Sequence, residues 1–368
     1  MPDSALHAAR LGTTITATGS AAPQSLLERM PKWLICVPLV VQWLWLSLKH
    51  HSTTLPSAAN PAITSGGLVG EGKCEYFSGM GALARAATAP WCAIAPAQRD
   101  SMAAVRAAMA GAGLVFPLIV KPDLGMCGFG VRLVQDEAAL AAYFAAFPPD
   151  QTAVLQTFVP LEGEAGIFYA RHPDAPQGRI IGLALRHFPE VVGDGTSTIA
   201  ELMAAAPRTQ RLLERRDHDF TLNPLTVPAA GQTVRLSTIG STRIGGLYRD
   251  GGACATPALT AAIDAIARDM PTFHFGRFDV RFESLALLAQ GKGFWIMEVN
   301  GAGSEAIQAW DPDTPLLQGF RTIFAKQALL FAIGAANRRR GHAPMALREL
   351  ARLHWMQQRL LDRYPPSN

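Results

Sequence analysis

The feature that most constrains this chain is a pair of apolar segments, "GRFDVRF" and "GFWIMEVN", that each carry a carboxylate among strand-forming residues. We expect them to form paired strands. Side chains two residues apart share one face of a strand, so Arg277 accompanies Asp279 and Asn300 accompanies Glu298. Carboxylates are costly to bury in such strands without a cation. The pattern therefore predicts a Mg²⁺ site at Asp279, Glu298 and Asn300, although a salt-bridged sheet face would account for it too.

A second constraint is "PLIVKPDLGMCGFGVRLVQ", residues 117–135, in which an apolar run ends at Lys121 and is followed by Gly125, Gly128 and Gly130. Apolar segments on both sides of the glycines predict a β-hairpin. Glycines let a backbone approach phosphate closely, and the lysine adds a positive charge. A strand follows the glycines where a Rossmann turn would have a helix, which disfavours that fold. A bare glycine turn without a ligand is the alternative.

An upstream segment, "GLVGEGKC", matches the spacing G-x-x-x-x-G-K and ends at Lys73. Cys74 occupies the position where a P-loop has the Ser or Thr that holds magnesium. No strong apolar strand precedes the segment. A P-loop is therefore disfavoured, and Lys73 needs another explanation.

Composition narrows the class of protein. The chain has 368 residues, of which 49% are hydrophobic and 17% charged, so we expect a folded protein of two or three lobes. A net charge of +4 is too small for a dedicated nucleic-acid binder. The five cysteines are scattered and include no C-x-x-C pair, which favours a reducing, cytoplasmic location.

Two segments bear on membrane contact. Residues 33–48, "WLICVPLVVQWLWLSL", are uncharged, but 16 residues are fewer than the roughly 20 that a spanning helix needs. They are either a buried element or an element lying in the plane of a membrane surface. The C-terminal "LRELARLHWMQQRLLDRY" predicts a basic amphipathic helix that caps its own domain or lies on an anionic membrane. Peripheral contact with the inner face of a membrane is therefore one expectation.

Taken in order, Lys73, Lys121 with its glycine hairpin, "LQTFVPLEGE", "FD" and "EVN" resemble the ATP-grasp superfamily over residues 60–335. The similar branch contains carboxylate–amine ligases of the D-alanine–D-alanine ligase, glutathione synthetase and cyanophycin synthetase types. The resemblance implies an α+β fold in which two subdomains with antiparallel sheets sandwich ATP, preceded by a smaller N-terminal α/β lobe. The expected divisions are a flexible N-terminus (1–24), an N-terminal lobe with the Trp-rich segment (25–70), the small subdomain (71–155), the large subdomain with the metal site (156–336) and the basic C-terminal helix (337–368).

The resemblance also implies roles for individual residues. The nucleotide phosphates would be contacted by Lys73, Lys121 and the three hairpin glycines, adenine by Gln156, Phe158 and Val159, and ribose by Glu164. The γ-phosphate would lie near Arg186, Gly193, Asp194 and Gly195, and Arg277 would stabilise the transferring phosphoryl group. The metal would be held by Asp279, Glu298 and Asn300. Lys121, Arg186 and Arg277 would be the catalytic residues. The implied cofactors are ATP and two Mg²⁺ ions, with Mn²⁺ as an alternative.

The implied activity is an ADP-forming ligase that joins a carboxylate to an amine through an acyl-phosphate. The alternatives are a kinase-like phosphotransferase of the same superfamily and a membrane-surface nucleotide-binding module without ligase activity. The substrates would be small or lipid-linked, no nucleic acid is expected, and a homodimer is typical of the family. After Asn300 the chain reads "GAGSEA" in place of the Pro-Gly-Met segment of D-alanine–D-alanine ligases, which disfavours that product. Ser304 and Glu305 would either contact the acceptor substrate or cap a helix.

Overall fold

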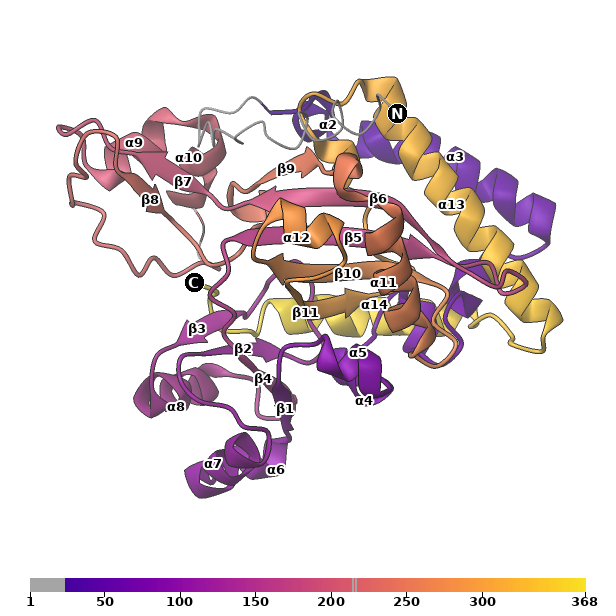
Figure 1. Ribbon diagram of the computed structural model, residues 1–368, viewed down its shortest axis with the longest axis horizontal. Coiled ribbons are helices and arrows are strands. Elements are labelled where there is room, and N and C mark those ends of the chain that lie inside the picture. The colour runs from indigo at the N-terminus through magenta and orange to yellow at the C-terminus, as the bar shows by residue number, and fades with distance from the viewer. Residues whose placement is uncertain (1–23, 214, 216) are drawn as a thin grey trace.

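The computed structural model describes residues 24–213, 215 and 217–368; residues 1–23, most of the predicted flexible N-terminus, lie outside the described residues. A five-stranded sheet forms the centre of the molecule, a four-stranded sheet lies beside it, and a two-stranded unit projects from another side (Figure 1). All strand pairs within these sheets are antiparallel. The predicted α+β fold with antiparallel sheets is confirmed.

The large sheet has the strand order β11-β10-β5-β6-β9. Its strands are β5 (Gly163–Ala170), β6 (Arg179–His187), β9 (Leu247–Asp250), β10 (Phe275–Phe282) and β11 (Phe294–Asn300). Alternating residues such as Ile167, Phe278 and Val280 pack on one face against the helices α4 (Lys73–Ser78), α5 (Ala82–Ala86), α11 (Pro257–Arg268) and α12 (Leu285–Ala289). The residues between them, including Arg277 and Asp279, therefore lie on the opposite face, which carries the candidate site.

One irregularity in this sheet matters for the site. Asp279 of β10 pairs with Glu298 of β11, but the next residue, Val280, pairs with Ile296. Met297 is the extra residue of a β-bulge and has no partner in this ladder. Its carbonyl group is therefore available to another donor.

The small sheet has the order β1-β4-β2-β3. Its strands are β1 (Trp91–Ile94), β2 (Leu118–Pro122), β3 (Arg132–Val134) and β4 (Ala153–Thr157), and its helices are α6 (Pro96–Arg99), α7 (Met102–Gly111) and α8 (Glu137–Ala146). The predicted hairpin is confirmed, with Leu118 paired to Val134. The strand β1 was not predicted, because four residues, "WCAI", are too few to show a period.

The projecting unit contains β7 (Glu190–Val192), β8 (Thr233–Arg235), α9 (Ile199–Ala205) and α10 (Pro207–Leu213). It has a core of its own, which includes Val191, Met203 and Leu212. The C-terminal residues connect it to the small sheet, since Ser367 bonds to Asp217 through both backbone and side chain and Asn368 bonds to Leu133. Figure 1 shows the C-terminus at the junction of the three units.

Residues 24–70 differ from the predicted α/β lobe, because they contain helices and 3₁₀ turns without a strand. These elements are α2 (Leu26–Arg29), α3 (Lys32–His50), η1 (Leu55–Ala58) and η2 (Thr64–Gly67). They bury their inner side chains against the long helix α13 (Leu316–Arg339) and the end of the large sheet. The sequence carries no period-two pattern here, so nothing favours strands.

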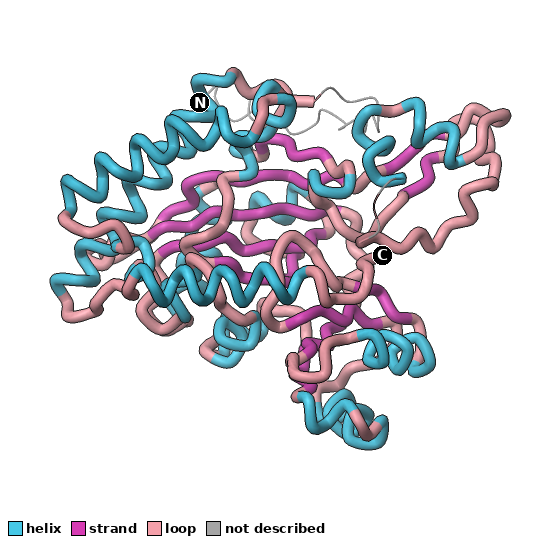
Figure 2. The backbone as a smooth tube through the Cα atoms, turned by 180° about the vertical axis from the view of Figure 1, so that it is seen from behind, coloured by secondary structure: helices cyan, strands magenta, loops and turns pink. Residues whose placement is uncertain are grey.

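Two other helices bear on the predicted membrane contacts. Among the described residues, α3 is the one helix whose length and composition would suffice to cross a membrane. The C-terminal helix α14 (Leu347–Leu361) buries Leu350, Leu353 and Leu360, and so caps its own protein with the apolar stripe predicted from the sequence. Figure 2 shows α14 lying across the face of the large sheet opposite to that seen in Figure 1.

The remaining 3₁₀ turns are η3 (Thr242–Ile244), η4 (Gly252–Cys254) and η5 (Ile307–Trp310).

Candidate active site

A cleft of about 310 Å³ is lined by residues of both sheets and by the loops around them. The large sheet contributes residues of β5, β6, β10 and β11; the small sheet contributes β2, β4 and the glycine loop between β2 and β3. Of the predicted site residues, the cleft brings together Lys73, Lys121, Gly125, Gly128, Gln156, Phe158, Val159, Glu164, Arg186, Arg277, Asp279, Glu298 and Asn300. Residues from six separated segments therefore meet in one place.

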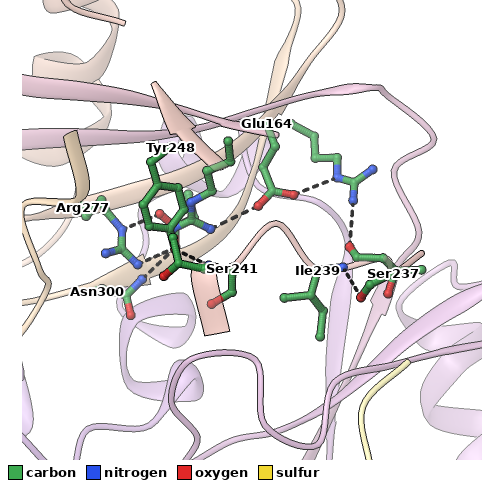
Figure 3. Close-up of polar contacts among 12 residues, drawn as sticks. Glu164, Ser237, Ile239, Ser241, Tyr248, Arg277 and Asn300 are labelled. Atoms are coloured by element: carbon green, nitrogen blue, oxygen red, sulfur yellow. Dashed lines mark hydrogen bonds and ion pairs between the residues drawn. The ribbon is translucent and has the colours of Figure 1, made fainter. Parts of the chain in front are cut away.

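The four polar residues of β10 and β11 form the floor. Arg277 pairs with Asn300, and Asp279 pairs with Glu298, so all four side chains share one face. Asp279 is 2% exposed. Its carboxylate accepts two bonds from Arg277, with Nε 2.6 Å from Oδ1 and an Nη atom 2.9 Å from Oδ2. Asn300 donates its Nδ2–H to the same carboxylate at 3.2 Å, as Figure 3 shows.

A second arginine completes this cluster. An Nη atom of Arg186, on β6, lies 3.0 Å from Asp279 Oδ2, and its other Nη atom lies 3.1 Å from Glu164 Oε1. Burial by itself would raise the pKa of Asp279, but Arg186 and Arg277 hold it below its usual range. Asp279 is therefore ionised, and its charge is balanced by the two guanidinium groups.

Glu164 lies between two arginines (Figure 3). Its second oxygen is 3.5 Å from Nε of Arg281, which also donates to the carbonyl of Leu161 at 2.9 Å. Arg281 lines the cleft and was missed from the sequence, although its place two residues after Asp279 was a signal. Both Glu164 and Arg281 are nearly inaccessible to solvent. The predicted ribose contact of Glu164 stays a prediction.

Lys121 approaches the floor from β2 of the small sheet. Its buried ammonium donates to Oε1 of Gln156 at 2.6 Å and to the carbonyl of Met297 at 2.8 Å. The β-bulge thus supplies the acceptor that joins the two sheets. Burial lowers the pKa of Lys121 to about 8. Gln156 also donates to the carbonyl of Ala89, so its side chain positions the lysine.

Lys73 reaches the same floor from the first turn of α4. Its Nζ lies 3.4 Å from Glu298 Oε1 and 3.3 Å from the carbonyl of Asp123. The Asp123 carboxylate accepts the backbone N–H of Cys74, and burial raises the pKa of the Cys74 thiol to about 12. This segment therefore contacts the hairpin rather than forming a P-loop. Lys73 is paired with Glu298, and Lys121 is bonded to the Met297 carbonyl beside it.

Not every predicted residue lines the cleft. Gly130 packs between Pro122 and Tyr364, and its carbonyl accepts the Tyr143 hydroxyl. Gly193, Asp194 and Gly195 lie in the projecting unit after β7, next to residues 228–232. The Asp194 carboxylate accepts bonds from Thr196 and Ser197, so it organises a local turn. A phosphate contact of these three residues stays a prediction.

One end of the cleft contains polar atoms without partners. Oε2 of Glu71 and Oγ of Ser304 are enclosed by protein atoms, and neither has a hydrogen-bond partner among the described residues. Burial raises the pKa of Glu71 to about 7. Glu305 and Gln357 line the same cleft. Unpaired buried polar groups are costly, so this end is suited to a polar ligand.

Solved structures provide one comparison with known proteins. The chain matches a D-cycloserine synthetase, DcsG, at 16% identity, with a TM-score of 0.38 over 74% of this chain and 70% of that one. It matches a D-alanine–D-alanine ligase from Bacillus anthracis at 15% identity and a TM-score of 0.38, over 70% of this chain and 66% of that one. It also matches a bifunctional glutathione synthetase from Pasteurella multocida at 17% identity and a TM-score of 0.35, over 66% of this chain and 35% of that one.

The chain is similar to ATP-grasp ligases. The same class of enzyme was named by the resemblance stated from the sequence. The chain spans about a third of the length of the glutathione synthetase. At TM-scores below 0.4 the likeness carries no argument about chemistry, which rests on the residues of the cleft. No family model matches the sequence, and no curated protein matches it.

The sequence predicts a Mg²⁺ site at Asp279, Glu298 and Asn300, which all lie on the floor of the cleft. No group of three or more His, Cys, Asp or Glu side chains lies together in the described part of the chain, but two carboxylates and one amide do. Asn300 uses its Nδ2–H toward Asp279, which leaves its oxygen available, and the side chain of Glu298 is one-third exposed. Mg²⁺ needs few protein oxygens. Glu298 and the Asn300 oxygen therefore fit Mg²⁺, whereas the Asp279 carboxylate is occupied by Arg186, Arg277 and the Asn300 amide.

Proposed function

We propose that this protein is an ATP- and Mg²⁺-dependent ligase that joins a carboxylate to an amine and releases ADP and phosphate. The observation that carries the proposal is the convergence of Lys73 and Lys121 on the strand residues Asp279, Glu298 and Asn300. Two lysines and two arginines around two carboxylates suit a nucleotide triphosphate with its metal. A salt-bridged structural face would not need a cleft above it, or a lysine from helix α4 and another from the small sheet directed at it.

In the proposed reaction a substrate carboxylate oxygen attacks the γ-phosphorus, and the bond from that phosphorus to the ADP oxygen breaks. The amine nitrogen then attacks the acyl carbon, phosphate leaves, and the nitrogen loses a proton. Mg²⁺, when bound, would neutralise phosphate charge. Lys121 and Lys73 would hold the phosphates, and Arg186 and Arg277 would stabilise the charge on the transferring group. The protein contributes positioning and charge.

The end of the cleft at Glu71 and Ser304 supports a second, polar substrate. Glu71 Oε2 and Ser304 Oγ have no hydrogen-bond partner in the described part of the chain, so both oxygens can accept a hydrogen bond from a ligand. An ammonium or hydroxyl group supplies such a donor. We therefore propose that the amine binds here, beside the "GAGSEA" loop. The five free cysteines and the use of ATP favour a cytoplasmic location, and the substrates are small or lipid-linked acids and amines.

The proposal is tested by trapping the intermediate. Purified protein is incubated with ATP, Mg²⁺, a panel of carboxylic acids and hydroxylamine, and hydroxamate formation is measured together with ADP. We expect one class of acid to give hydroxamate and ADP in equal amounts. Replacing hydroxylamine by a panel of amines, with mass spectrometry of the products, then identifies the acceptor.

The alternatives give other products. A phosphotransferase would yield a stable phosphorylated compound without hydroxamate, and a nucleotide-binding module would release no ADP. Glu298→Gln serves as the matched variant, because it keeps the size of the side chain and removes one metal-binding charge. If Glu298→Gln left the activity unchanged, the ligase proposal would fail.

A further inference from the structure

The outer face of α3 is apolar and uncovered in the described part of the chain. Large side chains recur at three- and four-residue spacing, which places them on one face of the helix. They are Trp33, Val37, Val40, Val41, Leu44, Trp45 and Leu48, and each is more than half exposed. Figure 1 shows α3 at the edge of the molecule, beside α13.

The inner face of α3 is fixed to the protein. Leu46 is buried against Phe331 of α13. The rings of Trp43 and Phe331 pack edge to face, with their centroids 5.1 Å apart. Gln42 donates to the carbonyl of Phe324, also on α13, at 3.0 Å. A helix held along its length by its own protein cannot cross a bilayer in this structure. It can only lie flat on whatever covers its outer face.

The uncovered area is unusually large. An aromatic side chain has a surface of roughly 150–250 Å². Two tryptophans and five aliphatic side chains, each more than half exposed, therefore present several hundred square ångströms together. The largest apolar patch on a typical monomer is about 300–600 Å² and is often functional. The stripe on α3 lies at or above the upper end of that range.

Charge indicates what covers the stripe. The helix contains no acidic residue, and it has Lys32 at its start and Lys49 and His50 at its end. Arg338 of α13 lies beside that end and donates to the carbonyl of His50 at 2.9 Å. Trp33 and Trp45 lie near the two basic ends, and Lys49 is 5.2 Å from the Trp45 ring. An apolar stripe with tryptophans and cations at both ends matches an anionic membrane surface.

The same charges disfavour a second copy of the chain. If two α3 helices packed face to face, either parallel or antiparallel, a basic end would meet a basic end. The helix has no carboxylate to neutralise them. Like charges brought together in this way cost free energy.

We propose that α3 lies in the plane of an anionic lipid bilayer, with its outer apolar face inserted between the headgroups. The protein is then a peripheral membrane protein. This inference rests on α3 alone and does not depend on the proposed reaction.

The test is flotation of the full chain with vesicles of phosphatidylglycerol and phosphatidylcholine, compared with vesicles of phosphatidylcholine alone. We expect binding to the anionic vesicles that weakens with added salt. Val41→Glu combined with Leu48→Glu should weaken it by roughly a hundredfold, about tenfold for each apolar side chain lost from the interface. The matched control is Val115→Glu combined with Leu225→Glu. These two residues are also a Val and a Leu, their side chains are exposed, at 73% and 74%, and neither lies on α3.

Each outcome decides the question. Loss of binding in the α3 variant alone supports the proposal, and so does quenching of wild-type tryptophan fluorescence by brominated lipid that disappears in Trp33→Phe with Trp45→Phe. The quenching measurement uses folded wild-type protein, so a misfolded glutamate variant does not leave the question open. A wild type that does not float, or that floats equally with neutral vesicles, overturns the proposal. Concentration-dependent dimerisation that the α3 variant abolishes, without vesicle binding, assigns the face to a second copy.

Discussion

Replacing Lys121 by methionine should make the protein more stable at neutral pH while weakening nucleotide binding. The ammonium of Lys121 is buried, and burial lowers its pKa from 10.5 to about 8. A lysine shifted by that amount destabilises the folded protein by roughly 3 kcal/mol below pH 8, because the unfolded chain binds the proton more tightly. Methionine has a similar length and carries no charge to desolvate.

Two lost hydrogen bonds reduce this gain. Methionine cannot donate to Gln156 Oε1 or to the Met297 carbonyl, and each unpaired acceptor costs about 1 kcal/mol. The expected net gain for Lys121→Met is therefore about 1 kcal/mol at pH 7. Between pH 8 and 10.5 the unfolded wild type binds more protons than the folded wild type, so wild-type stability rises with pH. The advantage of the variant should shrink and then reverse over that range.

The assay is urea unfolding of both proteins at pH 7 and pH 9.5, with the exposed Lys292→Met as control. The control should show no such pH-dependent difference. ATP affinity, measured by calorimetry, should fall by roughly tenfold to a hundredfold in Lys121→Met, because a charged hydrogen bond to phosphate is worth about 1.5–3 kcal/mol. If Lys121→Met is less stable than wild type by the same amount at both pH values, the lysine is not penalised by burial and the reasoning is refuted.

Three further predictions concern the carboxylates of the cleft. Asp279→Ala should lower the free energy of unfolding by about 3–5 kcal/mol in urea titrations, because it leaves the buried Arg186 and Arg277 without their shared partner. An unchanged urea midpoint of unfolding would show that the two guanidinium groups find other partners. Glu298→Gln should change stability by less than about 1 kcal/mol, since its side chain is one-third exposed, yet should abolish Mg²⁺-dependent ADP release. Glu71→Gln should gain stability relative to wild type as the pH rises from about 4.5 to about 7, because the raised pKa of Glu71 means that the folded wild type holds this proton more tightly than the unfolded chain does; a constant difference across this range would contradict the burial of a charge.

The parts of the fold that follow from short-range pattern were predictable. The alternation in "GRFDVRF" and "WIMEVN" places Arg277, Asp279, Glu298 and Asn300 on one face, and the register confirms that they are adjacent across the strands. The hairpin of β2 and β3 follows from two apolar segments around glycines. Both features depend on the pattern of residues within short single segments, for which local pattern is informative.

The parts that depend on distant contacts were not predictable. The β-bulge that presents the Met297 carbonyl to Lys121 depends on how the two sheets meet, and no residue type marks it. The segment "GDGTST" could bind phosphate through its glycines, or its Asp194 could accept hydrogen bonds from the residues that follow it, as it does in the structure. The sequence alone does not distinguish these two conformations. For α3, composition showed an apolar helix or strand, but only the packing on α13 shows which face is left uncovered.

The charges of the cleft point to an exchange of partners on ligand binding. Each carboxylate of the floor is paired with a cation that a nucleotide phosphate would also attract: Glu298 with Lys73, and Asp279 with Arg277 and Arg186. Charges in a buried site are held only while they are paired, so neither set can be released unless a replacement arrives. Nucleotide phosphates would pair with Lys73, Arg186 and Arg277. A divalent cation would then pair with Glu298 and Asp279, the carboxylates that lose these partners. If both ligands bind as proposed, their binding would be coupled through the same ion pairs, because each ligand would remove the competitor of the other.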